Sequence, residues 1–198
     1  MLDNHQQALH NILPPEILAR AAAVPISPLS ASNNVGLQTL SWYLPTAEVA
    51  LQLRTIYYSH AAWMYVFSHP ISYVYTLIRS YFRYNPINKE SFDTEVYSQI
   101  YDQATGPIPD DPLTSHRLSV MFMVLAIGSL MNISLPSYNL EAEKYHQLAR
   151  AALFHYPIFD EPTITAVQAL VCLIAQSPFP YIERSSVVLD DILFVFRG

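Results

Sequence analysis

The chain has 198 residues, enough for one domain with a sizeable core, but charged residues make up only 13% of it, about half the usual share. Hydrophobic residues make up 52%, and this combination indicates a missing partner, a missing part of the protein or a membrane. The net charge of −6 argues against nucleic acid as a direct ligand, and the single cysteine excludes a disulfide framework and a cysteine zinc cluster.

Residues 1–40 are predicted to form a flexible N-terminal segment, because prolines, serines and asparagines recur along them. Only Pro15–Val24 has a helical pattern there, with proline in the first turn and alanines after it. The beginning of the chain lacks the basic and apolar regions of a secretory signal. The folded region is assigned to residues 41–176. A divergent tail, 177–198, contains the apolar run Ile192–Phe196, which fits a strand or a helix.

The first helix of the folded region is predicted over Thr46–Tyr65. Pro45 suits its first turn, and Glu48 lies near its positive N-terminal end. Apolar and aromatic residues recur at helical spacing and form one inward stripe: Val49, Leu53, Ile56, Tyr57, Ala61 and Met64. The following stretch, Val66–Tyr84, is rich in tyrosine, is broken by Pro70 and is compatible with a short helix over Val74–Phe82.

Asn88 is expected to cap the next helix, because an asparagine side chain can accept hydrogen bonds from the first backbone N–H groups. Phe92, Val96 and Ile100 are spaced four apart and define its inner face. Gln103–Pro112 is then predicted as a loop, because its glycine and three prolines cannot share a regular element.

The central helix is predicted over about His116–Met131, with Thr114 or Ser115 as its cap. It is apolar nearly all round, so protein or lipid must cover it. Ala126 and Gly128 would allow another backbone to approach closely. Its densest apolar face comprises Leu118, Met121, Phe122, Leu125, Ala126 and Ser129.

Two more helices follow, the first capped by Ser137 or Asn139 and ended by Pro157, the second beginning at Pro162 or Thr163. In the first, we expect Ala142, Tyr145, Ala149, Ala152 and Leu153 inside, and Lys144, Gln147 and Arg150 outside. In the second, we expect Ile164, Val167, Leu170, Val171 and Ile174 inside. No β–α–β alternation occurs, so the predicted fold class is all-α: an irregular and incomplete helical bundle.

Two uncharged runs, Ile56–Ile78 and Leu118–Leu140, are about long enough to span a bilayer. The first contains two histidines and a proline, and the second ends in a loop-like sequence, so both are interpreted as buried core. A small helical membrane-associated protein is the alternative interpretation.

No catalytic, cofactor-binding or metal site is assigned from the sequence, and we expect no enzyme activity. The few glycines form no phosphate-binding loop. Cys172 lies in an apolar helix and is interpreted as a buried structural thiol. The aspartate pairs at 110–111 and 190–191 are interpreted as solvated surface charge. The histidines are interpreted as capping or packing residues: His5, His10, His60, His69, His116, His146 and His155. An aromatic set is interpreted as core in preference to a ligand pocket: Trp42, Tyr57, Tyr58, Trp63 and Tyr65.

Five stretches in order carry a family resemblance: YLPTAEVALQLRTIYYSHAAWMY (Tyr43–Tyr65), NPINKESFDTEVYSQIYD (Asn85–Asp102), DPLTSHRLSVMFMVLAIGSL (Asp111–Leu130), EAEKYHQLARAAL (Glu141–Leu153) and EPTITAVQALVCL (Glu161–Leu173). Together they resemble the regulatory middle homology domain of fungal binuclear zinc-cluster transcription factors. The resemblance implies an all-helical regulatory domain of a nuclear protein that controls transcription by RNA polymerase II. It also implies action through inhibition, effector response or partner contacts.

The chain departs from that family in three ways. The six-cysteine zinc cluster is absent, so neither zinc nor DNA binding is assigned to any residue here. Val66–Tyr84 interrupts two matching stretches and is interpreted as an insertion from a retained intron or an erroneous gene model. The match stops near Gln176, so the domain is expected to be truncated. Its expected partners are other proteins or the missing helices of its own domain, and DNA only through the absent zinc-cluster module.

Overall fold

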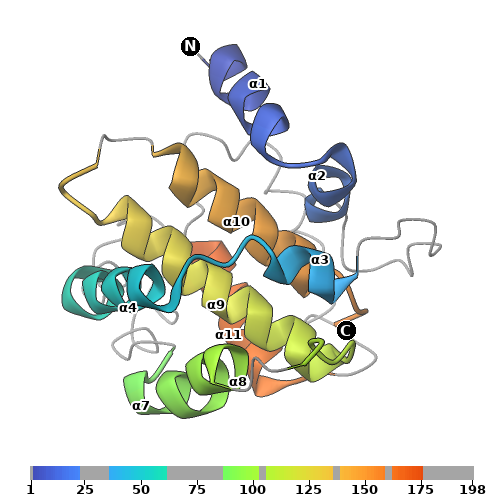
Figure 1. The fold of residues 1–198 in the computed structure, drawn as a ribbon, viewed down its shortest axis with the longest axis vertical. Helices are drawn as coiled ribbons and strands as arrows, with labels where there is room; N and C mark the ends of the chain where they lie inside the picture. Colours follow the sequence, from blue (N-terminus) through green and yellow to red (C-terminus); the bar gives the residue numbers. More distant parts are fainter. Residues whose placement is uncertain are drawn as a thin grey trace, which may run out of the picture.

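The computed structural model describes residues 2–22, 36–61, 87–102, 106–135, 139–158 and 162–175, and every regular element within these ranges is helical (Figure 1). The all-α class is therefore confirmed. The elements are α1 (Leu2–Ile12), α2 (Pro15–Ala21), α3 (Leu37–Ser41), α4 (Ala47–Ile56), the π-helix η1 (Tyr57–Ala61), α7 (Lys89–Ser91), the π-helix η2 (Phe92–Tyr97), α8 (Ser98–Tyr101), α9 (Pro112–Leu130), α10 (Leu140–Leu153) and α11 (Ile164–Ala175). The predictions for Val66–Tyr84, Ser137 and Ile192–Phe196 fall outside the described ranges.

The centre of the fold is α9, which is buried on all sides. Of the residues from Ser115 to Ser129, all but Arg117 are buried, so α9 has no solvated face. Helices α4, α10 and α11 and both π-helices pack around it (Figure 1). The absence of a polar stripe in its sequence is thus explained by neighbours on every side.

The start of α9 corrects the predicted cap. The N-cap is Asp111, whose carboxylate accepts a hydrogen bond from the Thr114 backbone N–H at 2.9 Å. Pro112, predicted as the end of the loop, is the first helical residue, where its missing N–H costs nothing. Neither Thr114 nor Ser115 is the cap, because both lie inside the first turn.

Helices α9 and α10 run antiparallel and are joined in a regular register. The Ser115 hydroxyl donates to the Ala152 carbonyl at 2.6 Å, and the Ser119 hydroxyl donates to the Ala149 carbonyl at 2.8 Å. One turn further along, the rings of Phe122 and Tyr145 stack with centroids 6.2 Å apart. Small side chains at 149 and 152 allow the serines to reach the α10 backbone. The predicted inward face of α10 is confirmed, and Asn139 is its cap.

The N-terminal residues are helical where they are described, whereas the sequence predicts a linker outside Pro15–Val24. Leu9, Leu13 and Ile17 are buried, and α2 packs on α10 (Figure 1). This packing explains a second difference. The α10 side chains expected to face outward, Lys144, Gln147 and Arg150, are only partly exposed. Periodicity within α10 cannot show that a distant segment returns to cover its polar side.

Two helices differ from the predicted inward face, α4 only in part, since Leu53 and Tyr57 are buried as predicted. In α4, Ala50 is buried whereas Val49 is 39% exposed, and the α-helix gives way to η1 at Tyr57. In α11, Ala166 and Ala169 are buried whereas Ile164 is 81% exposed. Alanines are buried in both helices, beside Leu53 and Tyr57 in α4–η1 and beside Cys172 in α11.

Candidate functional site

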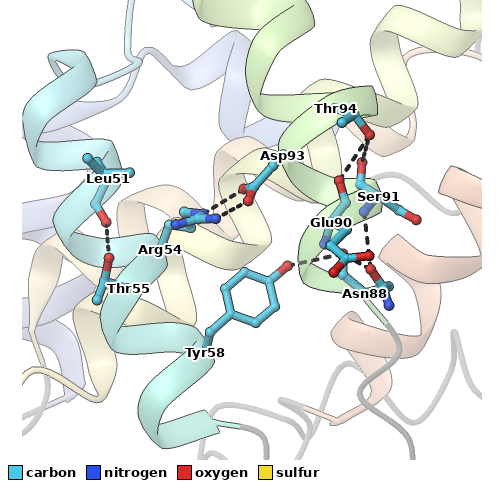
Figure 2. Close-up of polar contacts among 9 residues, drawn as sticks. All are labelled: Leu51, Arg54, Thr55, Tyr58, Asn88, Glu90, Ser91, Asp93 and Thr94. Carbon is cyan, nitrogen blue, oxygen red and sulfur yellow. Dashed lines mark hydrogen bonds and ion pairs between the residues drawn. The ribbon is translucent and has the colours of Figure 1, made fainter.

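The first polar cluster joins α4 and η1 to the segment α7–η2 (Figure 2). The Arg54 guanidinium binds the Asp93 carboxylate through two nitrogens, with Nε 2.7 Å from Oδ1. Beside this pair, the guanidinium lies 5.7 Å from the centre of the Tyr58 ring. Asn88 accepts from the Glu90 and Ser91 N–H groups, which confirms it as a helix cap.

This cluster is a structural clamp between antiparallel helical segments. Near the start of α4, the Tyr101 hydroxyl donates to the Pro45 carbonyl at 2.8 Å. At the other end, the Tyr58 hydroxyl lies 3.5 Å from the Asn88 carbonyl oxygen. Burial raises the pKa of Tyr58, so this phenol stays protonated and can donate at neutral pH. The arrangement holds two segments together.

A second cluster joins three segments that are far apart in the sequence. Arg20 Nη1 of α2 lies 3.0 Å from His155 Nδ1, just after α10. His155 Nε2 lies 3.1 Å from Asp110 Oδ1, in the loop before α9. The Tyr156 hydroxyl donates to the Asp110 backbone carbonyl at 2.8 Å. We call this set the Arg20–His155–Asp110 chain.

The chemistry of the two neighbours fixes the tautomer of His155. A guanidinium has donors only, so His155 Nδ1 must accept and carries no proton. The remaining proton is on Nε2, where it is donated to the Asp110 carboxylate. Because both ring nitrogens are engaged, this histidine cannot take a proton from a substrate without first breaking one of these contacts. The prediction of Asp110 as purely solvated charge is incomplete, since it orients this ring.

His116 in the first turns of α9 is fully buried and confirms the interpretation as a packing residue. Its Nδ1 lies 2.8 Å from Thr163 Oγ1, which also accepts from the Ala166 N–H at the start of α11. The His116 Nε2 atom is buried and has no hydrogen-bond partner among the described residues. Burial lowers the pKa of His116, although Asp111 opposes the shift, so the ring is neutral at pH 7.

The remaining candidates for chemistry are accounted for by packing. Cys172 is fully buried in α11, as predicted for a structural thiol. Within the described ranges, no group of three His, Cys, Asp or Glu side chains is placed to hold a metal ion. Of the aromatic set, Tyr57 is fully buried but Trp42 is 72% exposed, so the prediction of core is wrong for Trp42. His5, His69, Trp63 and Tyr65 are not among the side chains described.

The most distinctive surface is an apolar one on α11. Ile164 is 81% exposed and Val167 is 56% exposed, and their spacing of three places them on the same side of the helix. We call these two residues the α11 outer face. The helix contains no charged residue, so nothing on it solvates this face strongly. Sequence periodicity placed both residues inside, and this prediction is wrong because both are exposed.

Comparison of the chain with protein-family models, with curated proteins and with solved structures finds no match.

Proposed function

We propose that this chain is part of the helical regulatory domain of a fungal transcription factor, and that it regulates transcription by RNA polymerase II in the nucleus through protein contacts. DNA binding belongs to a separate zinc-cluster module of such a protein. The chain itself carries no catalytic role in this proposal.

The observation that carries the proposal is the α11 outer face. Large branched side chains at 164 and 167 are exposed while alanines and Cys172 fill the interior contact. A soluble protein seldom leaves such residues uncovered on an uncharged helix unless another protein surface covers them. The proposed occupant is an apolar helical surface, either from the remainder of the same domain or from a partner protein.

The positions of the five resembling stretches give further support. They contain α4 with η1, the segment α7 to α8, α9, α10 and α11, with few described residues left over between them. Helices α4, α10 and α11 and both π-helices pack directly on α9, and α7 and α8 pack on η2. A resemblance restricted to helices of one continuous core is expected from a domain rather than from chance similarity of isolated helices.

The membrane-associated alternative is supported less well. Within the described residues, α9 is the one helix long and apolar enough to cross a bilayer, but 78% of its apolar window is buried inside the protein. The helices packed around α9 already cover its apolar side chains. The part of the other uncharged run that is described, Ile56–Ala61, lies in α4 and η1 against α9.

A reporter assay in yeast tests the proposed function. The whole chain is fused to an unrelated DNA-binding module, and transcription from a promoter carrying its binding site is measured. We expect the fusion to change reporter transcription and Ile164→Asp with Val167→Asp to abolish the change. Ile133→Asp is the matched control, because Ile133 is 96% exposed and lies in the turn after α9 and not in α11. This variant should retain the effect.

Two outcomes would contradict the proposal. A fusion that is expressed, nuclear and without effect on the reporter would remove the regulatory role. A fusion whose effect survives the double substitution would remove the α11 outer face as the contact surface. Transcript sequencing provides an independent check, since the proposal requires a six-cysteine cluster encoded upstream in the same message.

A further inference from the structure

We propose that His155 is a proton-operated latch, which in its neutral form holds the C-terminal end of α2 against α10 and in its protonated form releases it. The inference concerns the Arg20–His155–Asp110 chain and does not depend on the proposed function. His155 is partly buried and lies where three segments meet.

The geometry makes the contact with Arg20 sensitive to one proton. Protonation of His155 adds an N–H at Nδ1, which then faces the Arg20 guanidinium 3.0 Å away. Two donors cannot share a hydrogen bond, and the two groups would also carry like charges. The Arg20–His155 hydrogen bond is therefore lost, and the repulsion between the two charges weakens the docking of α2, because Arg20 is attached to its last turn.

The contact with Asp110 responds in the opposite sense. The Nε2–H of a protonated ring still donates to the Asp110 carboxylate, and the charge strengthens this bond. The turn after α10 and the loop before α9 consequently stay together. The weak point on protonation is the link to α2, so the expected movement is local.

The groups that face His155 come from each packed segment. Among the described residues they are Arg20 from α2, Asp110 from the loop before α9, and Tyr156 beside it in edge-to-face contact. The Asp110 side chain is 62% exposed, which screens its attraction, whereas that of His155 is only 12% exposed. Burial and then Arg20 lower the pKa of His155, and Asp110 opposes them.

Release of this link matters because α2 is short. It has seven residues and buries Ile17 and Ala21, so its helical state depends on docking to the rest of the fold. An undocked α2 would expose these side chains together with the α10 surface beneath them. Acidification would in this way expose a second apolar surface, in addition to the α11 outer face.

Hydrogen exchange of the full chain between pH 7.5 and pH 5, read by mass spectrometry and corrected for the intrinsic pH dependence, tests the latch. Protection of α2 amides should fall about tenfold for each pH unit below the ordinary histidine pKa of 6.5, then level off below the lowered pKa of the docked state. Peptides from the centre of α9 should keep their protection over the same range.

His155→Gln is the matched variant, because a glutamine amide can accept from Arg20 with its oxygen and donate to Asp110 with its nitrogen but does not titrate. Its α2 protection should not depend on pH. Arg20→Met removes the opposing charge, so the NMR-measured pKa of His155 should rise toward the ordinary value. The latch is overturned by α2 protection that is independent of pH in the natural chain, by an unchanged pH response in His155→Gln, or by parallel loss of protection in α9.

Discussion

Gly128 on α9 lies against the main-chain carbonyl of Leu53 on α4, and no Cβ atom fits between the two backbones. The absence of a side chain at this position sets how closely α4 can approach the central helix. It also explains why α4 turns Ala50, and not Val49, toward the interior. The close approach was predicted from the glycine, whereas its partner was not.

Gly128→Ala should therefore destabilise the protein. Overpacking against a backbone atom typically costs about 1–3 kcal/mol. This should exceed the gain of about 1 kcal/mol that alanine brings to a helix interior. Urea unfolding followed by circular dichroism measures the change. Gly106→Ala is the control, because nothing lies within 4 Å of a Cβ there, and its midpoint should not fall. Equal midpoints for the two variants would refute the close contact.

Leu125→Ala should lower the free energy of unfolding by about 2–5 kcal/mol, because the leucine is fully buried in α9 and its loss leaves a cavity. Leu51→Ala offers a comparison on α4, where the leucine is 47% exposed and the expected loss is well below 1 kcal/mol. Both are measured by urea unfolding in the same buffer. Similar losses for the two leucines would contradict the central position of α9.

Removal of residues 66–84, with Tyr65 joined to Asn85, should leave a folded protein. The described segments on either side are already held together, by Arg54 with Asp93 and by Tyr58 with Asn88. Shortening the connection lowers the entropic cost of closing it, by about 1 kcal/mol. Thermal unfolding should remain cooperative, with a midpoint no lower than that of the parent chain. The control places Asp93→Ala in the shortened chain, which should lose stability because the clamp is broken. Loss of cooperative unfolding on deletion alone would contradict the insertion hypothesis.

Stability should fall on acidification through His116. Its folded-state pKa is lowered by burial, so the unfolded chain binds more protons and stability rises with pH. The contribution is complete above about pH 6.5 and is lost progressively as the pH falls toward the lowered folded-state pKa. Urea midpoints between pH 7.5 and pH 5 measure this in the His155→Gln background, which removes the titration of His155. His116→Asn should flatten the dependence. If the urea midpoint of His116→Asn falls with pH as steeply as that of its parent, groups other than His116 cause the loss of stability.

The isolated chain should associate in solution through the α11 outer face. Burial of an isoleucine or valine side chain contributes about 1.5–3 kcal/mol, so two such residues can drive self-association when no other surface covers them. Sedimentation velocity should show oligomers, and Ile164→Asp with Val167→Asp should weaken association at least about tenfold. Ile133→Asp should leave it unchanged. A monodisperse, cooperatively unfolding monomer of the unsubstituted chain would contradict this expectation.

The sequence by itself determined the helical class, the apolar central helix predicted over about His116–Met131, the cap at Asn88 and the buried state of Cys172, and it left Ser137 or Asn139 as the cap of α10. These follow from local chemistry: helical spacing, side chains that accept backbone N–H groups, and a helix without a polar face. Such features are read within one segment, so they require no knowledge of what packs against it.

Only the tertiary structure decided which side of α4 and α11 faces inward, that α2 returns to cover α10, and that Arg20, His155 and Asp110 meet. A helix that is apolar on two sides has no preferred inward face until its neighbours are placed. In α11 the neighbour is α9, and close packing selected Ala166 and Ala169 for the contact in place of Ile164. The large side chains were left outside because the small ones bring the two backbones closer together.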